Sequence, residues 1–165
     1  MSFMYDASIP VFQRFLKNLD TFLERAEKYA EQKKFDSVVL VRARLAPDMF
    51  DLARQVQIAA DMAKGCAARL TGAEPPKFDD NEATIAELRA RIKKTLDYIG
   101  SVDKKGFEGS ETRDIVLAMR DRTLEFKGKE YLNGWVLPNF YFHVTTTYAI
   151  LRHNGLELGK MDFLA

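Results

Sequence analysis

The sequence predicts an all-α fold, a four-helix bundle with a small β-hairpin inserted before the last helix. Four long segments carry apolar side chains at three- and four-residue steps, which is the spacing of one buried helical face. Ahead of the last of these segments the spacing changes to alternation, which is typical of paired strands. With 165 residues, the chain has the length of one domain with one core, and we expect a single domain over 1–165.

Charge and composition narrow the functional classes. The chain has 25 basic and 24 acidic residues, a net charge of +1, so no overall field attracts it to nucleic acid or to an anionic membrane. There is no run of 18 apolar residues, and the start lacks the basic residues and cleavage site of a signal peptide. The single cysteine, Cys66, has no partner for an intramolecular disulfide. We therefore expect a soluble, cytoplasmic protein with no nucleic acid and no membrane among its partners.

The first long helix is predicted over roughly Ser8 to Gln32. Pro10 fits only near its first turn, because proline has no N–H to donate to an earlier carbonyl. The residues of its buried stripe are Phe12, Phe15, Leu16, Leu19, Phe22, Leu23, Ala26 and Ala30. The following segment, Phe35 to Leu45, is compatible with either a short helix or an extended connector, since Asp36 favours a turn and its valines favour extension.

The second long helix is predicted from about Pro47 to Leu70. Pro47 suits a first helical position, and Asp48 and Asp51 would lie near the positive end of the helix dipole. Alanines dominate the second half of its buried stripe, which indicates close approach of a neighbouring helix. Cys66 lies beside that stripe, and we expect a small buried residue there rather than a nucleophile.

The clearest break in the chain is the connector Thr71 to Asp80. Its adjacent prolines force extended backbone, and its length exceeds the needs of a tight helical hairpin, so we expect it to cross the bundle. The third helix is predicted over about Asn81 to Val102, with Asp80 or Asn81 capping its start.

The alternating segment runs from Arg113 to Lys127 and predicts a hairpin that turns at Arg120–Arg122. Because a lone hairpin is marginal in water, we expect it to lie against the bundle. The last helix is predicted over about Pro138 to His153, ended by Asn154 and the glycine after it. The tail, residues 156–165, is too apolar to be free, so it either packs back on the bundle or meets a second subunit.

The residues from Trp135 to Gly155 include the only tryptophan and both histidines, so a site is sought there first. His143 and Thr147 fall on one helical stripe, where a buried imidazole needs hydrogen-bond partners. His143 is then either part of a small polar site inside the bundle or a satisfied core histidine. His153 lies about 80° away around the helix and does not converge with His143 as a metal ligand.

Other polar and aromatic residues complete the candidate set. Gln55 and Asp48 lie near the apolar face of the second helix, and Tyr131 and Trp135 have the aromatic surface of a pocket wall, although aromatic residues at this spacing are more often core. The predicted pocket comprises His143, Thr147, Gln55, Asp48, Trp135 and Tyr131. Catalytic zinc usually has three protein ligands, and the chain has no HExxH or CxxC motif, so we expect no metal site and no cofactor.

Three stretches of the chain resemble a known family. Residues 137–164, LPNFYFHVTTTYAILRHNGLELGKMDFL, closely resemble the C-terminal signature of a bacterial domain-of-unknown-function family. Residues 8–12 and residues 46–57 are similar to its other hallmarks. That family is grouped with the DinB/YfiT-like four-helix bundles. The resemblance implies an up-down-down-up bundle with a long connection between its second and third helices.

Many DinB-like relatives are metal-dependent, and some are thiol-dependent transferases. The resemblance implies one histidine on the second helix and an H-x-x-x-H pair on the fourth. His143 matches a histidine of the fourth helix, but Thr147 and Leu151 follow one and two turns later. On the second helix, residues 55–58 contain no histidine. The usual metal triad is therefore missing from this sequence.

The sequence thus predicts a DinB-like bundle without the usual triad, which binds a small molecule or forms a homodimer through its second and fourth helices. The alternative is a metal-dependent enzyme of the thiol-transferase type, with a degenerate site around His143, Asp48 and Gln55. A third hypothesis is a purely structural dimer with the tail and the aromatic faces as its interface. Whether the protein is an enzyme stays open at this point.

Overall fold

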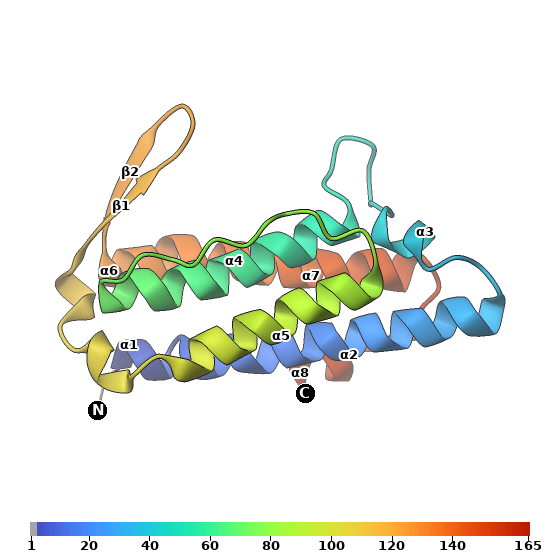
Figure 1. Ribbon diagram of the computed structural model, residues 1–165, viewed down its shortest axis with the longest axis horizontal. Coiled ribbons are helices and arrows are strands. Elements are labelled where there is room, and N and C mark those ends of the chain that lie inside the picture. The colour runs from blue at the N-terminus through green and yellow to red at the C-terminus, as the bar shows by residue number, and fades with distance from the viewer. Residues whose placement is uncertain (1–2) are drawn as a thin grey trace.

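The computed structural model describes residues 3–165 and has the predicted architecture, a helical bundle with a hairpin before its last helix. Four long helices lie along the longest axis of the molecule (Figure 1): α2 (Ile9–Lys33), α4 (Leu52–Thr71), α5 (Ile85–Ser101) and α7 (Leu137–His153). Helices α4 and α5 run in one direction, and helices α2 and α7 both run in the opposite direction, which is the up-down-down-up order. The shorter elements are α1 (Phe3–Asp6), α3 (Val38–Val41), η1 (Lys104–Phe107), η2 (Ser110–Thr112), β1 (Asp114–Ala118), β2 (Thr123–Lys127), α6 (Gly128–Glu130), η3 (Tyr131–Val136) and α8 (Lys160–Leu164).

The core is built from the apolar faces of the four long helices. All eight residues of the predicted α2 stripe are buried. Phe12 and Phe15 of α2 meet the ring of Phe140 on α7 edge to face, with centroids 4.9 and 6.3 Å apart. On α4, the residues Ala59, Ala60, Ala63 and Ala67 are fully buried, as close packing of its neighbours requires.

Two predicted helix starts were wrong. The second long helix begins at Leu52 rather than near Pro47, because the Asp51 side chain accepts the backbone N–H of Arg54 at 3.0 Å and so caps it. Asp48 therefore lies in the loop before the helix, away from its first turn. The third long helix begins at Ile85.

The start of α5 is set by a capping box rather than by Asp80 or Asn81. The Thr84 hydroxyl accepts the N–H of Glu87 at 3.2 Å, while the Glu87 carboxylate accepts the N–H of Thr84 at 3.0 Å. The segment Phe35 to Leu45, which allowed two readings, contains the single-turn helix α3.

The predicted hairpin is confirmed. Strands β1 and β2 are antiparallel and pair Ile115 with Phe126 and Leu117 with Leu124. The expectation that the hairpin lies against the bundle holds only in part, because Ile115, Leu117 and Phe126 pack on the core while the tip projects away (Figure 1). Ile115 is 4% exposed, and the ring of Phe126 lies 5.9 Å from that of Trp135.

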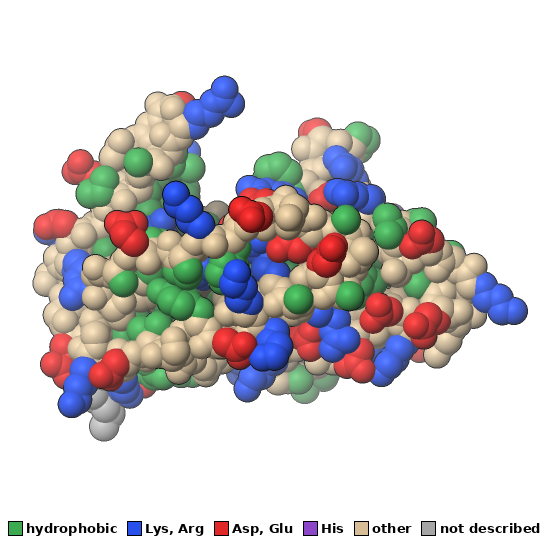
Figure 2. All heavy atoms as spheres, viewed as in Figure 1, with side chains coloured by type: hydrophobic (Ala, Val, Ile, Leu, Met, Phe, Trp, Pro, Cys, Tyr) green, Lys and Arg blue, Asp and Glu red, His purple; other side chains and the backbone are tan. Residues whose placement is uncertain are grey.

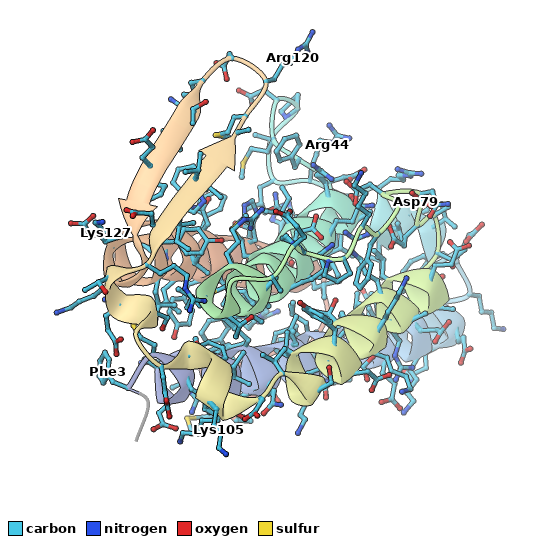
Figure 3. All side chains as sticks on the ribbon, turned by 60° about the vertical axis from the view of Figure 1, so that its left-hand side comes forward. Phe3, Arg44, Asp79, Lys105, Arg120 and Lys127 are labelled. Atoms are coloured by element: carbon cyan, nitrogen blue, oxygen red, sulfur yellow. The ribbon has the colours of Figure 1, made fainter. Side chains whose placement is uncertain are left out.

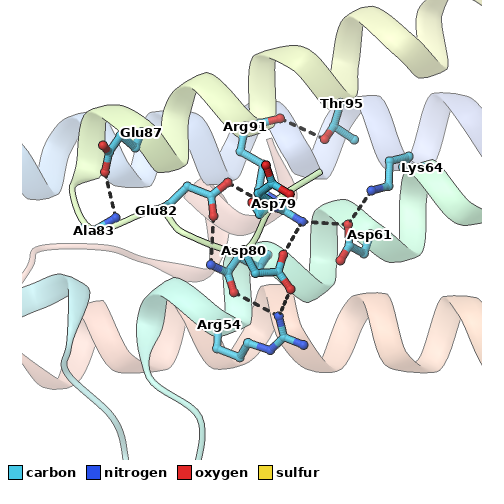
Figure 4. A network of polar contacts seen from close by, with 11 residues as sticks. Arg54, Asp61, Lys64, Asp79, Asp80, Glu82, Ala83, Glu87, Arg91 and Thr95 are labelled. Carbon is cyan, nitrogen blue, oxygen red and sulfur yellow. Dashed lines mark hydrogen bonds and ion pairs between the residues drawn. The ribbon is translucent and has the colours of Figure 1, made fainter. Parts of the chain in front are cut away.

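The connector of residues 72–84 returns along the bundle beside α4 to reach the start of α5 (Figure 1). Figure 4 shows how it is held. The buried guanidinium of Arg91 on α5 forms ion pairs with Asp61 of α4 and with Asp80 and Glu82 of the connector, at 2.8 to 2.9 Å. The connector's Phe78 presents its ring to the ammonium group of Lys64, 4.0 Å away.

The tail packs back on the bundle, which was one of the two expected placements. Leu156 and Leu158 are buried, and the Asn18 amide on α2 donates to the Phe163 carbonyl at 2.9 Å. The Phe163 ring lies 5.0 Å from that of Phe15. Within residues 3–165, no helix has the length and hydropathy needed to cross a bilayer.

We expect Arg91→Ala to lower the free energy of unfolding by about 3 kcal/mol, because it leaves three carboxylates facing a buried, unfilled site. Urea denaturation measures this loss. Arg89→Ala, two residues away, is the matched control. Arg89 forms an ion pair with Asp20, and both side chains are about one third exposed to solvent. We therefore expect the free energy of unfolding to fall by less than about 1 kcal/mol. Equal losses in the two variants would contradict the role assigned to Arg91.

Candidate functional site

His143 and Gln55, two of the predicted site residues, are hydrogen-bonded to one another across the bundle. The Nδ1 atom of His143 on α7 lies 2.6 Å from Oε1 of Gln55 on α4, and both side chains are buried. The Gln55 amide nitrogen donates to the Phe50 carbonyl at 3.1 Å, so its oxygen is the atom that faces the imidazole. Nδ1 of His143 therefore carries the proton and donates it to Gln55.

The environment of His143 keeps the imidazole neutral. Burial, followed by the positive charge of Arg54, lowers the pKa of His143 to about 4. Among residues 3–165, the one buried side-chain nitrogen or oxygen without a partner is Nε of Arg91, so Nε2 of His143 retains contact with solvent. The pair can thus offer one neutral imidazole lone pair as a hydrogen-bond acceptor or weak base.

Thr147 and Asp48 do not extend this pair. The Thr147 hydroxyl, fully buried, donates to the His143 carbonyl at 2.9 Å, so it serves the helix backbone. Asp48 is exposed in the loop before α4 and makes no hydrogen bond with His143 or Gln55. Across the described range 3–165, no three His, Cys, Asp or Glu side chains are grouped as a metal site requires.

The remaining predicted residues, Tyr131 and Trp135, line a different place in the molecule. A cavity of about 680 Å³ lies between the hairpin and the bundle, and we call it the hairpin cavity. Figure 2 shows the notch between the projecting hairpin and the rest of the surface, and Figure 3 shows the hairpin from the side, with Arg120 at its tip and Lys127 at its base. The lining of the hairpin cavity includes Ile115, Leu117 and Met119 from the hairpin side, Met62 and Arg69 from α4, and Tyr131 and Trp135 from η3.

The walls of the hairpin cavity are positioned by two local features. The alternation of the hairpin places Ile115 and Leu117 on the same face of β1. Tyr131 and Trp135 belong to η3, a π-helical segment, whose wider turn is often found at functional sites. Both aromatic rings contact the ring of Phe126 on β2, at 6.0 and 5.9 Å, and so join the hairpin to the bundle.

Arg69 is one of the charged residues that line the cavity. Its Nη1 donates to the Tyr131 hydroxyl at 3.1 Å. Burial raises the pKa of Tyr131 to about 12, so the phenol is neutral. Arg69 crosses directly over Gly65, one turn earlier on α4, where any Cβ would collide with the guanidinium. Gly65 therefore leaves the space in which Arg69 reaches Tyr131.

Arg69 and Gly65 were missed from the sequence. A signal existed, since glycine inside a helix costs about 1 kcal/mol relative to alanine and its presence indicates a packing reason. Cys66, beside Gly65, is fully buried, and burial raises the pKa of its thiol, so the prediction of a buried residue there is confirmed.

The depressed pKa of His143 predicts a pH-dependent stability. His143 takes up a proton near pH 6.5 in the unfolded chain but only near pH 4 in the folded one, so acidification favours unfolding. We expect the free energy of unfolding to fall by about 2 kcal/mol from this group between pH 7.5 and pH 5. The loss should be absent in His143→Gln and retained in the variant of the exposed histidine, His153→Gln. Urea denaturation at both pH values gives the comparison, and an unchanged slope in His143→Gln would refute the assignment.

The comparisons with known proteins agree with this fold. Residues 4–164 match the family described as "Domain of unknown function (DUF1993)". The crystal structure of a DinB family member protein from Shewanella denitrificans is 45% identical in sequence and has a TM-score of 0.89, over 98% of this chain and 91% of that one. No curated protein matches. The resemblance inferred from the sequence is confirmed, and the chain belongs to the DUF1993 family, a domain of unknown function within the DinB-like bundles.

Proposed function

We propose that this protein binds a small organic molecule in the hairpin cavity. The observation that carries the proposal is the cavity itself, which has a volume of about 680 Å³ and walls from three separate elements. Small-molecule sites are typically about 300–1,000 Å³, largely apolar, with a few polar groups that orient the ligand. Leu117, Met62 and Trp135 supply apolar surface, while Arg69, held by the buried Tyr131 hydroxyl, supplies hydrogen-bond donors.

The His143–Gln55 pair has a supporting role in this proposal. Gln55 lies in the first turn of α4 and Arg69 in its last, which places them about 20 Å apart along the helix. His143 is therefore too far away to touch a ligand of the hairpin cavity. Its bond to Gln55 instead holds α4 against α7, and α4 carries Met62 and Arg69 of the cavity lining.

Self-association is a second candidate function, and the outer side of α7 favours it. Phe142 is 56% exposed there, and Phe50, just before α4, is 57% exposed. Large apolar side chains of this exposure are common at interfaces between subunits. The proposed dimer buries Phe142 of each copy.

A cytoplasmic location is part of the same proposal. A reducing compartment suits a protein whose one cysteine, Cys66, is buried and unpaired within the described chain.

Nile red, a neutral dye that fluoresces in apolar surroundings, tests binding in the hairpin cavity. We expect its fluorescence to rise with the protein and the emission of Trp135, the only tryptophan, to be quenched, since Trp135 lines the cavity. Leu117→Asn should weaken binding about tenfold by placing an amide on the apolar wall. Leu124→Asn is the matched control, because Leu124 pairs with Leu117 across the hairpin but does not line the cavity. Equal effects of the two variants would argue against this site.

Sedimentation velocity at micromolar concentration tests the dimer. We expect a dimer for the unmodified protein and a dissociation constant raised at least about tenfold in Phe142→Ser, since the variant dimer loses two interface aromatics and a loss of about 0.7 kcal/mol from each already gives that factor. Met161→Ser serves as control, because Met161 is 76% exposed on α8, outside the proposed interface. A monomer at all concentrations would rule out this candidate.

A further inference from the structure

Arg69 differs from the other arginines of the described chain. Arginines 25, 42, 44, 54, 89 and 91 form ion pairs with carboxylates. Arginines 14, 120, 122 and 152 are exposed to water. Only Arg69 and Arg113 within residues 3–165 are half-buried and form no ion pair, and both line the hairpin cavity. The Arg113 guanidinium is already held by the Leu70 carbonyl, 2.7 Å away, at the end of α4.

The carboxylates near the cavity do not neutralise Arg69. Asp114 and Glu74 both line the cavity, but both are exposed, at its rim. Asp114 is paired with Lys127, at the base of the hairpin. The two cations of the cavity lining, Arg69 and Arg113, are therefore its more buried charges, while its two carboxylates are exposed to water.

The guanidinium of Arg69 also has donors to spare. Its one hydrogen-bond partner in the described chain is the Tyr131 hydroxyl, which engages Nη1. The Nε and Nη2 atoms of Arg69 are not among the fully buried atoms that lack a partner, so they have contact with solvent, and Arg69 is one of the residues that line the cavity. A planar guanidinium held in place by one bond, with free N–H groups beside it, has the geometry that accepts a carboxylate through two parallel hydrogen bonds.

Several other residues of the cavity lining are apolar. Leu117 and Met119 come from the hairpin side, and Met62 lies on α4 two turns before Arg69. Trp135 adds a flat aromatic surface beside them. A molecule that fills the cavity thus meets both the cation of Arg69 and a group of apolar side chains.

We infer that the ligand of the hairpin cavity is an organic acid, with its carboxylate bound by Arg69 and an apolar body beneath the hairpin. This inference rests on the proposed function and adds the chemical class of the ligand. Tyr131 positions Arg69, and Gly65 makes the space for it. The charge of Arg69, rather than the shape of the cavity alone, selects acids over neutral molecules of the same size.

Displacement of Nile red by 2-naphthoate and by 2-naphthalenemethanol tests the inference, because the two probes share an apolar body and differ in the carboxylate. We expect the acid to bind about tenfold more tightly than the alcohol, the range of a charge-assisted hydrogen bond. Arg69→Gln should abolish the preference by weakening binding of the acid much more than binding of the alcohol, while Arg69→Lys should retain part of it. Arg120→Gln, which removes the same charge at the exposed tip of the hairpin, should retain it in full.

The outcomes separate the two proposals. Equal binding of acid and alcohol would overturn the inference and leave small-molecule binding intact. A preference that survives in Arg69→Gln would overturn the role of Arg69. If neither probe nor Nile red binds the unmodified protein, both proposals fail. Circular dichroism and the melting temperature of each variant establish that a change in affinity does not come from loss of folding.

Discussion

The contact on which the structure depends most is the one between Arg91 and its three carboxylates. Helices α4 and α5 run in the same direction, so the chain must travel back along the length of the bundle between them. The connector that does this has no helix or strand of its own, and side chains must fix its path. Burial by itself lowers the pKa of Arg91, but Glu82, Asp61 and Asp80 outweigh it and raise that pKa, so the guanidinium is charged. One cation thereby joins α5, α4 and the connector (Figure 4).

Helix α4, followed by this connector, carries residues of both polar sites, the His143–Gln55 pair and the hairpin cavity. Its first turn carries Gln55, which bonds His143, and its last turn carries Arg69, which bonds Tyr131. The alanines between them allow α7 to approach closely, so the two ends of α4 are held in a fixed relation to α7 and η3. The hairpin adds a wall to the second of these places, although its tip projects away from the bundle.

The sequence predicted those features that local patterns encode. Periodicity identified α2 and α7, and alternation identified the hairpin, each within a residue or two of its observed bounds. The start of α4 was misplaced because Pro47 and Asp48 resemble a helix start, whereas the loop is fixed by contacts such as the bond from the Leu52 N–H to the Ala43 carbonyl. The capping box of α5 was present in the sequence as Thr84 and Glu87 but was overlooked.

The candidate site was predicted less completely, and for a physical reason. His143 and Gln55 were each recognised as polar residues on apolar faces, but they are 88 positions apart, and only the packing of α7 on α4 brings them together. Tyr131 and Trp135 were grouped with them because aromatic side chains can form the wall of a pocket. Their cavity instead depends on where the hairpin stands and on Arg69, and neither is visible in the spacing of residues.

The π-helical segment η3 also sets the direction in which its side chains point, about the helix axis, relative to those of α7. Its six residues, Tyr131–Val136, wind more slowly than an α-helix, and α7 continues from them directly. One residue in an α-helix corresponds to a rotation of about 100°. Removing a single residue from this segment would therefore leave α7 docked in the core by Phe140 and His143 while turning Tyr131 and Trp135 away from the hairpin. The wide turn of η3 rotates the side chains before it relative to those after it. One continuous helical segment can therefore direct α7 side chains into the bundle and η3 side chains toward the cavity.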